Sequence, residues 1–86
     1  MLSTMSADAL SLVLARALRA ERARAGLSQT ELAARLGTSQ TRVAALESGA
    51  RKLYAAELPD LCRALGVTLA DLLHRADPED RAALGL

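Results

Sequence analysis

Apolar residues recur in the first part of the chain at intervals of three and four, the spacing of one face of an α-helix. This pattern predicts a helix over roughly residues 7–25. Its apolar stripe consists of Leu10, Leu14, Leu18, Ala17 and Ala25. Ser6 or Asp8 can cap its start. Gly26 can end it, because glycine adopts the left-handed backbone conformation without a steric penalty.

A second, shorter helix of about eight residues is predicted after Ser28. Ser28 and Glu31 have the spacing of a capping box, in which the hydroxyl and the carboxylate each accept a backbone amide of the other residue. This helix is predicted to stop at Gly37. Its predicted inward side chains are Leu32, Ala33 and Leu36.

The next helix is predicted over residues 40–48, with Ser39 as its N-terminal cap and Gly49 as its end. Val43 and Leu46 supply its whole apolar side. A narrow apolar edge of this kind leaves most of the helix surface available to another molecule. The outward positions are small or polar: Gln40, Thr41, Arg42, Ala44 and Ala45.

A fourth helix is predicted over about residues 56–65, ending at Gly66. It begins with acidic residues and a proline, which suit the first turn of a helix. Its apolar stripe is Leu58, Leu61, Cys62 and Leu65.

The box from Thr68 to Asp71 predicts a fifth helix that runs to about Ala76. Residues 77–86 are predicted to form a short polar tail. The sequence shows no repeat or linker, so residues 1–86 are predicted to form one all-α, five-helix domain with an extended first helix.

Composition supports a helical, cytoplasmic protein. Hydrophobic residues make up 51% of the 86 residues, with no Phe or Trp, and Ala and Leu favour helix. No apolar run reaches the roughly 18 residues of a membrane span, and the first residues lack the pattern of a signal peptide. The single cysteine fits a reducing compartment.

Charge is distributed unevenly although the net charge is only +1. Residues 15–52 hold eight basic and three acidic side chains, whereas residues 53–86 hold three basic and six acidic ones. A basic N-terminal half beside an acidic C-terminal half suggests one face for phosphate groups and another for a different contact.

Four residues have the spacing that two steeply crossing helices require: Ala33, Gly37, Val43 and Leu46. A small residue is needed where the backbones approach, and Ala33 supplies it. Gly37 can take the positive φ of the turn, while Val43 and Leu46 anchor the second helix. An antiparallel helical hairpin would instead need longer and more apolar helices. The pattern therefore predicts a helix-turn-helix unit at about residues 28–48.

Four separated motifs occur in the order expected for one family: residues 26–33, Gly37, residues 46–49 and residues 64–67. On these motifs the chain resembles, from about Ala15 to His74, the phage-repressor and Cro class of helix-turn-helix regulators, also called XRE-like. The resemblance implies a lambda-repressor-like DNA-binding domain.

The resemblance also implies roles for individual residues. Residues 40–48 would lie in the major groove of double-stranded DNA. Gln40 would read a base, since a Gln amide can bond N6 and N7 of adenine together. Further base or methyl contacts are expected from Thr41, Arg42 and Ala45. Contacts with the DNA backbone are expected from Gln29, Ser39, Ser48, Arg51 and Lys52.

Arg22 and Glu47 match a pair that, in the family, ties the first helix to the end of the recognition helix. Such a pair is better evidence of fixed orientation than of stability. The sequence departs from familiar members in its early-starting first helix and in the absence of a strongly basic run after Gly49.

A symmetric homodimer on a palindromic site is expected, with half-sites about 34 Å apart or a multiple of that distance. Two interfaces remain open. The first is the fifth helix with the tail: Val67, Leu69, Leu72, Leu73, Ala83, Leu84 and Leu86. The second is the N-terminal extension: Leu2, Met5, Leu10, Leu12 and Val13.

Catalysis and metal binding are not expected. Cys62 and the serines have no evident base, no glycine-rich phosphate loop is present, and Cys62 with His74 makes too few ligands for a metal. No cofactor and no membrane contact are expected.

The function predicted is a DNA-binding transcriptional regulator, most simply a repressor. Restriction-modification controllers of this fold are one form of it. An antitoxin with the same fold and a toxin partner is an alternative. A module that kept the fold and lost DNA binding is a third, which the polar outward residues Gln40, Thr41 and Arg42 argue against.

Overall fold

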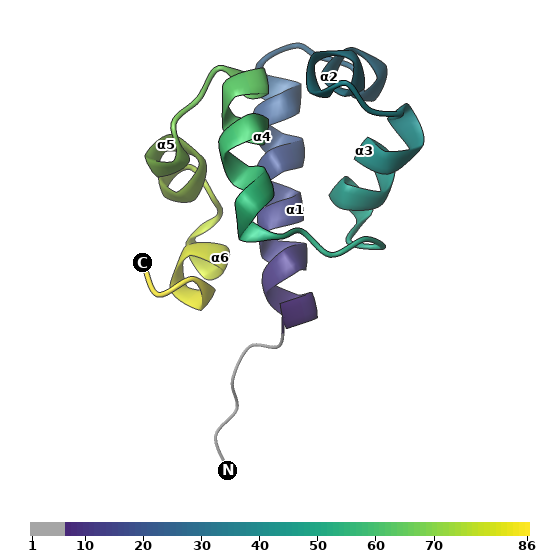
Figure 1. The fold of residues 1–86 in the computed structure, drawn as a ribbon. Helices are drawn as coiled ribbons and strands as arrows, with labels where there is room; N and C mark the ends of the chain where they lie inside the picture. Colours follow the sequence, from purple (N-terminus) through teal and green to yellow (C-terminus); the bar gives the residue numbers. More distant parts are fainter. Residues whose placement is uncertain (1–6) are drawn as a thin grey trace.

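The computed structural model describes residues 7–86, and all regular elements in this part of the chain are helical (Figure 1). In chain order they are α1 (Ala7–Arg24), α2 (Gln29–Leu36), α3 (Gln40–Ser48), the 3-10 helix η1 (Ala55–Glu57), α4 (Leu58–Leu65), α5 (Leu69–His74) and α6 (Pro78–Ala83). The prediction of an all-α domain is confirmed.

Helix α1 runs through the middle of the molecule, with α2 and α3 on one side and α5 and α6 on the other (Figure 1). The largest fully buried side chains come from four different helices: Leu18, Leu32, Val43 and Leu72. Burial of one such side chain contributes roughly 1.5–3 kcal/mol. These contacts hold α3 in a fixed place relative to α1.

The buried face of α1 differs from the predicted stripe. Leu10 is 39% exposed and Ala25 is exposed beyond the end of the helix, whereas Val13 and Ala15 are 3% and 1% exposed. Because α1 is covered by helices on two sides, it buries a wider face than the one-sided stripe that periodicity predicts. Three residues of the predictions lie outside the described part of the chain: Leu2, Met5 and Ser6.

The predicted fourth helix is divided in the structure into η1 and α4, which begins at Leu58. Pro59 occupies the first turn of α4. Since proline lacks an amide hydrogen and clashes with a preceding helical turn, the regular helix begins at this point.

The prediction of a polar tail is wrong, because α6 forms there and brings the number of described α-helices to six. Asp80 of α6 is 9% exposed and accepts two hydrogen bonds from Arg16 of α1, from Nε at 3.0 Å and from Nη2 at 2.7 Å. A six-residue helix is too short to be stable by itself. Its docking on α1 is therefore what stabilises α6.

Acid should weaken this docking. The hydrogen bonds from Arg16 hold the pKa of Asp80 below its usual value of about 3.9. A carboxyl with a lowered folded-state pKa stabilises the fold above its unfolded-state pKa, and that contribution is lost as the pH falls through the folded-state pKa. The wild type should therefore melt above an Asp80→Asn variant near neutral pH, and the difference should shrink below about pH 4. A difference in melting temperature that stays constant down to about pH 2 would contradict this account.

Candidate nucleic-acid interface

The unit formed by α2, its following turn and α3 packs on α1 through a small set of inward side chains. Ala33, Val43 and Leu46 are 3%, 1% and 6% exposed. Gly37 ends α2 with a φ of 68°, and the amide of Thr38 donates to the carbonyl of Ala33 at 2.9 Å. This left-handed turn, which favours glycine, sets the angle at which α3 leaves α2.

Helix α3 turns its polar side chains outward. Its N-cap Ser39 accepts a hydrogen bond from the amide of Arg42 at 3.2 Å. Ala45 is half-buried, as is its neighbour Ala44. The exposed side chains at or next to α3 are Ser39, Gln40, Thr41, Arg42 and Ser48. A convex, polar helix of this kind matches the size of the DNA major groove.

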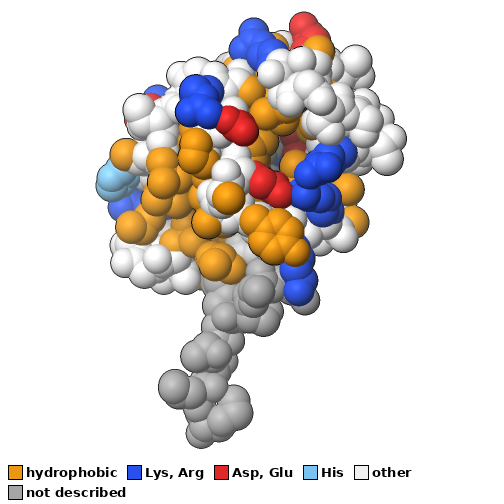
Figure 2. Space-filling model, viewed as in Figure 1, with side chains coloured by type: hydrophobic (Ala, Val, Ile, Leu, Met, Phe, Trp, Pro, Cys, Tyr) orange, Lys and Arg blue, Asp and Glu red, His pale blue; other side chains and the backbone are white. Residues whose placement is uncertain are grey.

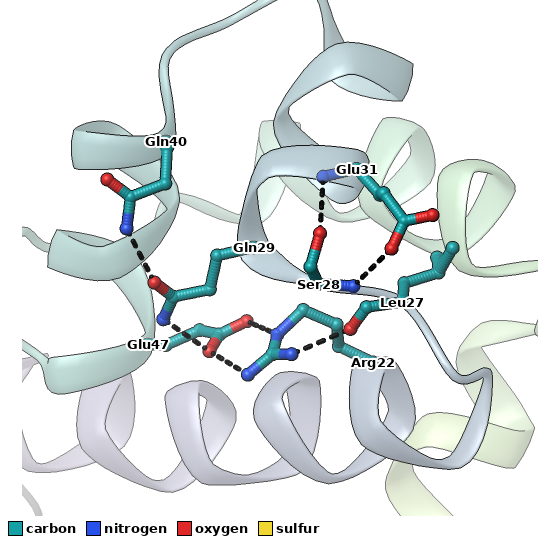
Figure 3. A network of polar contacts seen from close by, with 7 residues as sticks. All are labelled: Arg22, Leu27, Ser28, Gln29, Glu31, Gln40 and Glu47. Atoms are coloured by element: carbon teal, nitrogen blue, oxygen red, sulfur yellow. Dashed lines mark hydrogen bonds and ion pairs between the residues drawn. The ribbon is translucent and has the colours of Figure 1, made fainter.

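A chain of hydrogen bonds joins this outer surface to the interior (Figure 3). Nε2 of Gln40 donates to Oε1 of Gln29 at 2.7 Å, and Nε2 of Gln29 donates to Oε1 of Glu47 at 3.0 Å. Glu47 in turn accepts two hydrogen bonds from Arg22, from Nε at 2.6 Å and from Nη2 at 2.9 Å. Three helices thus contribute to one connected polar cluster.

The Arg22–Glu47 pair is shielded from water, with side chains 15% and 4% exposed. The hydrogen bonds to Glu47 raise the pKa of the Arg22 guanidinium. Arg22 also donates to the carbonyl of Leu27 at 2.7 Å, so its position is set from two directions. The pair therefore links α1 to α3 and to the loop before α2.

A basic residue of α1, Arg19, lies beside one flank of α3 and was not among the predicted DNA contacts. Arg19 of α1 lines a hollow of about 270 Å³ together with Gln29, Ala44, Glu47 and Ser48. Its side chain makes no ion pair or hydrogen bond with any described residue. A sequence signal existed, because position 19 lies one helical turn before Arg22 and so shares its face.

The other flank of α3 borders a wider groove of about 900 Å³, which extends to η1 and α4. Arg42 lines this groove, so it lies on the opposite side of α3 from Arg19. Arg51 makes two hydrogen bonds to Glu57, at 3.1 and 2.9 Å, and Lys52 is exposed. Part of the expected basic charge after Gly49 is thus already paired within the molecule.

Comparison with known proteins agrees with this geometry. Residues 18–72, more than half of the chain, match a family model described as helix-turn-helix. The chain belongs to the helix-turn-helix family. Its likeness to the XRE-like class of phage repressors and Cro is confirmed, and members of this class are DNA-binding transcription regulators rather than enzymes.

Three solved structures show what this helix-turn-helix protein is similar to. The clp gene regulator ClgR from Corynebacterium glutamicum is 31% identical, with 90% of this chain and 94% of that chain covered and a TM-score of 0.72. The hypothetical transcription factor NHTF from Neisseria is 31% identical, with 98% and 94% covered and a TM-score of 0.70. The restriction-modification controller protein C.AhdI from Aeromonas hydrophila is 29% identical, with 76% and 94% covered and a TM-score of 0.69.

No curated protein sequence matches the chain significantly. Within residues 7–86, no helix is both long and apolar enough to cross a bilayer. The same residues contain no cluster of three or more His, Cys, Asp or Glu side chains suited to a metal ion. Cys62, 6% exposed, packs in the core, where burial raises the pKa of its thiol.

Proposed function

We propose that this protein is a sequence-specific transcriptional repressor that binds double-stranded DNA as a dimer on a palindromic operator. The observation that carries the proposal is the outward polar face of α3, anchored on a helix-turn-helix scaffold by buried residues on its other side. Because its ligand would be DNA, we place the protein in the cytoplasm of a bacterium, or of a phage host.

Base recognition is assigned to the N-terminal half of α3. Gln40 would bond adenine through both atoms of its amide, and Thr41 would meet base edges or methyl groups. Arg42, on the groove side, would reach guanine or a phosphate. Ala45 is half-buried, which leaves only part of its methyl surface for a thymine methyl group.

Contacts with the DNA backbone are assigned to both flanks of α3. At the start of α2, the first-turn amides have no acceptor inside the helix, and Gln29 is the first residue of that turn. Arg19 would add a positive charge to the same phosphate site. The remaining backbone contacts are proposed for Ser39, Ser48, Lys52 and, after release of Glu57, Arg51.

Loss of the Arg19 charge should weaken binding evenly across DNA sequences. An Arg19→Gln variant should bind every duplex a few-fold more weakly, and the slope of log K against log salt should flatten by about one. Fluorescence anisotropy titrations at several salt concentrations measure both quantities. Arg75→Gln, which removes a partly exposed charge at the end of α5, on the side of α1 away from α3, is the matched control and should leave the slope unchanged. An unchanged slope in Arg19→Gln would remove this residue from the interface.

The proposed dimer interface lies on the side of α1 away from α3. Hydrophobic side chains gather on the face over α5 and the C-terminal segment (Figure 2), where Leu69 and Leu86 are 45% and 51% exposed. Leu72, included in the predicted interface, is fully buried in the core and cannot contribute. In the rival N-terminal interface, Val13 is excluded for the same reason, while Leu12 remains 40% exposed. Sedimentation of a monomer at tens of micromolar would argue against a constitutive dimer.

Selection of bound sequences from random duplex DNA tests the function directly. We expect a short two-fold-symmetric site whose binding weakens steeply as salt rises. Recovery of no preferred sequence, with binding that depends on charge alone, would overturn the proposal.

A restriction-modification controller is the second candidate, favoured by the similarity to C.AhdI over 76% of this chain. A controller would bind DNA next to genes for a restriction endonuclease and a methyltransferase. Mapping the selected site onto the genome that encodes the chain distinguishes this candidate from a regulator of unrelated genes.

A further inference from the structure

The polar chain from Arg22 to Gln40 has a fixed direction. A guanidinium can only donate hydrogen bonds, and an ionised carboxylate can only accept them. Glu47, held by Arg22 and 4% exposed, therefore faces Gln29 as an acceptor. Each amide along the chain must be oriented to suit that end.

Gln29 has one orientation that satisfies both of its neighbours (Figure 3). Its amide nitrogen must point to Glu47, and the observed Nε2–Oε1 distance is 3.0 Å. Its oxygen is then directed at Gln40, whose Nε2 donates to it at 2.7 Å. The charge of the shielded Glu47 carboxylate thus sets, through Gln29, the orientation of the exposed Gln40 amide.

In this orientation Gln40 has one amide hydrogen and its carbonyl oxygen left for another molecule. Adenine offers a donor at N6 and an acceptor at N7, which this pair of groups complements. Guanine offers acceptors at both O6 and N7. A Gln40 amide of the opposite orientation would present two donors and would suit guanine.

We propose that Glu47, whose side chain is only 4% exposed and is held by Arg22, is a positioning residue that makes Gln40 select adenine over guanine. This inference rests on the proposed function and adds a determinant of its specificity. Glu47→Gln removes the constraint, because an amide at this position can donate as well as accept. Both orientations of Gln29, and so of Gln40, then become available.

The test compares two duplexes that differ only at the base pair assigned to Gln40, with adenine in one and guanine in the other. That base pair is the one at which Gln40→Ala loses its preference. The ratio of the two dissociation constants should fall about five-fold or more in full-length Glu47→Gln. A merely structural role for Glu47 would weaken binding to both duplexes and leave the ratio unchanged.

Two further variants separate positioning from folding. Asp80→Asn removes another shielded carboxylate that accepts from an arginine, on the opposite side of α1, and should keep the wild-type ratio. Gln29→Met interrupts the chain of contacts but leaves both hydrogen bonds between Arg22 and Glu47 in place, and should lower the ratio as Glu47→Gln does. If Glu47→Gln does not fold, the ratio of dissociation constants measured for Gln29→Met tests the inference in its place.

The possible results have different consequences. A wild-type ratio in folded Gln29→Met, or a wild-type preference for guanine, would overturn the inference and leave the proposed function standing. A wild type that shows no sequence preference at all would overturn the proposed function, and the inference with it.

Discussion

Replacement of Glu47 by alanine should lower the free energy of unfolding by about 3 kcal/mol, because it leaves the shielded Arg22 guanidinium without its carboxylate. Removing one member of a buried ion pair costs more than the pair contributes, since the remaining charge keeps its desolvation penalty. The same change removes the acceptor of Gln29. Specific DNA binding should therefore fall together with stability.

Chemical denaturation with circular dichroism measures the first effect, and anisotropy at a temperature where the variant is folded measures the second. Asp60→Ala is the matched control, because it breaks the Arg63–Asp60 pair, whose side chains are 73% and 72% exposed. An exposed pair of this kind contributes about 0–1 kcal/mol. Equal losses of stability in the two variants would contradict the role given to Glu47.

Replacement of Gln40 by alanine should weaken binding to the selected site by about 10- to 100-fold, the range expected for loss of one bidentate base contact. Stability should change by no more than about 0.5 kcal/mol, since the side chain is exposed. Binding to unrelated duplexes should stay the same, because phosphate contacts carry it. The preference for one base should disappear at a single position in each half-site.

Competition titrations with single-base variants of the selected duplex locate that position. Glu79→Ala, an exposed change on α6, serves as the control and should bind like the wild type. If Gln40→Ala kept the full preference at every position, α3 would be docked differently from the proposal, or another residue would read the base.

Helix ends were predictable because the atoms that define them lie within a few residues of one another. The Ser28–Glu31 box is present with both hydrogen bonds, at 3.0 and 2.9 Å. Gly37 and Gly49 end their helices with φ values of 68° and 79°. The outward polar face of α3 followed from its composition, since Val43 and Leu46 leave no second apolar side.

Features that depend on contacts between distant residues were predicted less well. Residues 78–83 read as a polar tail because the partner of Asp80, Arg16, lies 64 positions away. The position of Arg19 beside α3 depends on how α1 and α3 cross, which helical spacing within α1 does not specify. The burial of Val13 in place of Leu10 likewise required knowledge of which helices cover α1.

By itself the sequence determined the ends of α2 and α3, the turn between them and the outward polar face of α3, because caps, glycines and apolar spacing act through the local backbone. The tertiary structure alone decided which charges are shielded and which way the amides of Gln29 and Gln40 point. These properties arise where α1, α2 and α3 meet, since burial raises the cost of leaving Arg22 or Glu47 without a partner. The shielded carboxylate then decides which atoms of Gln29 and Gln40 donate.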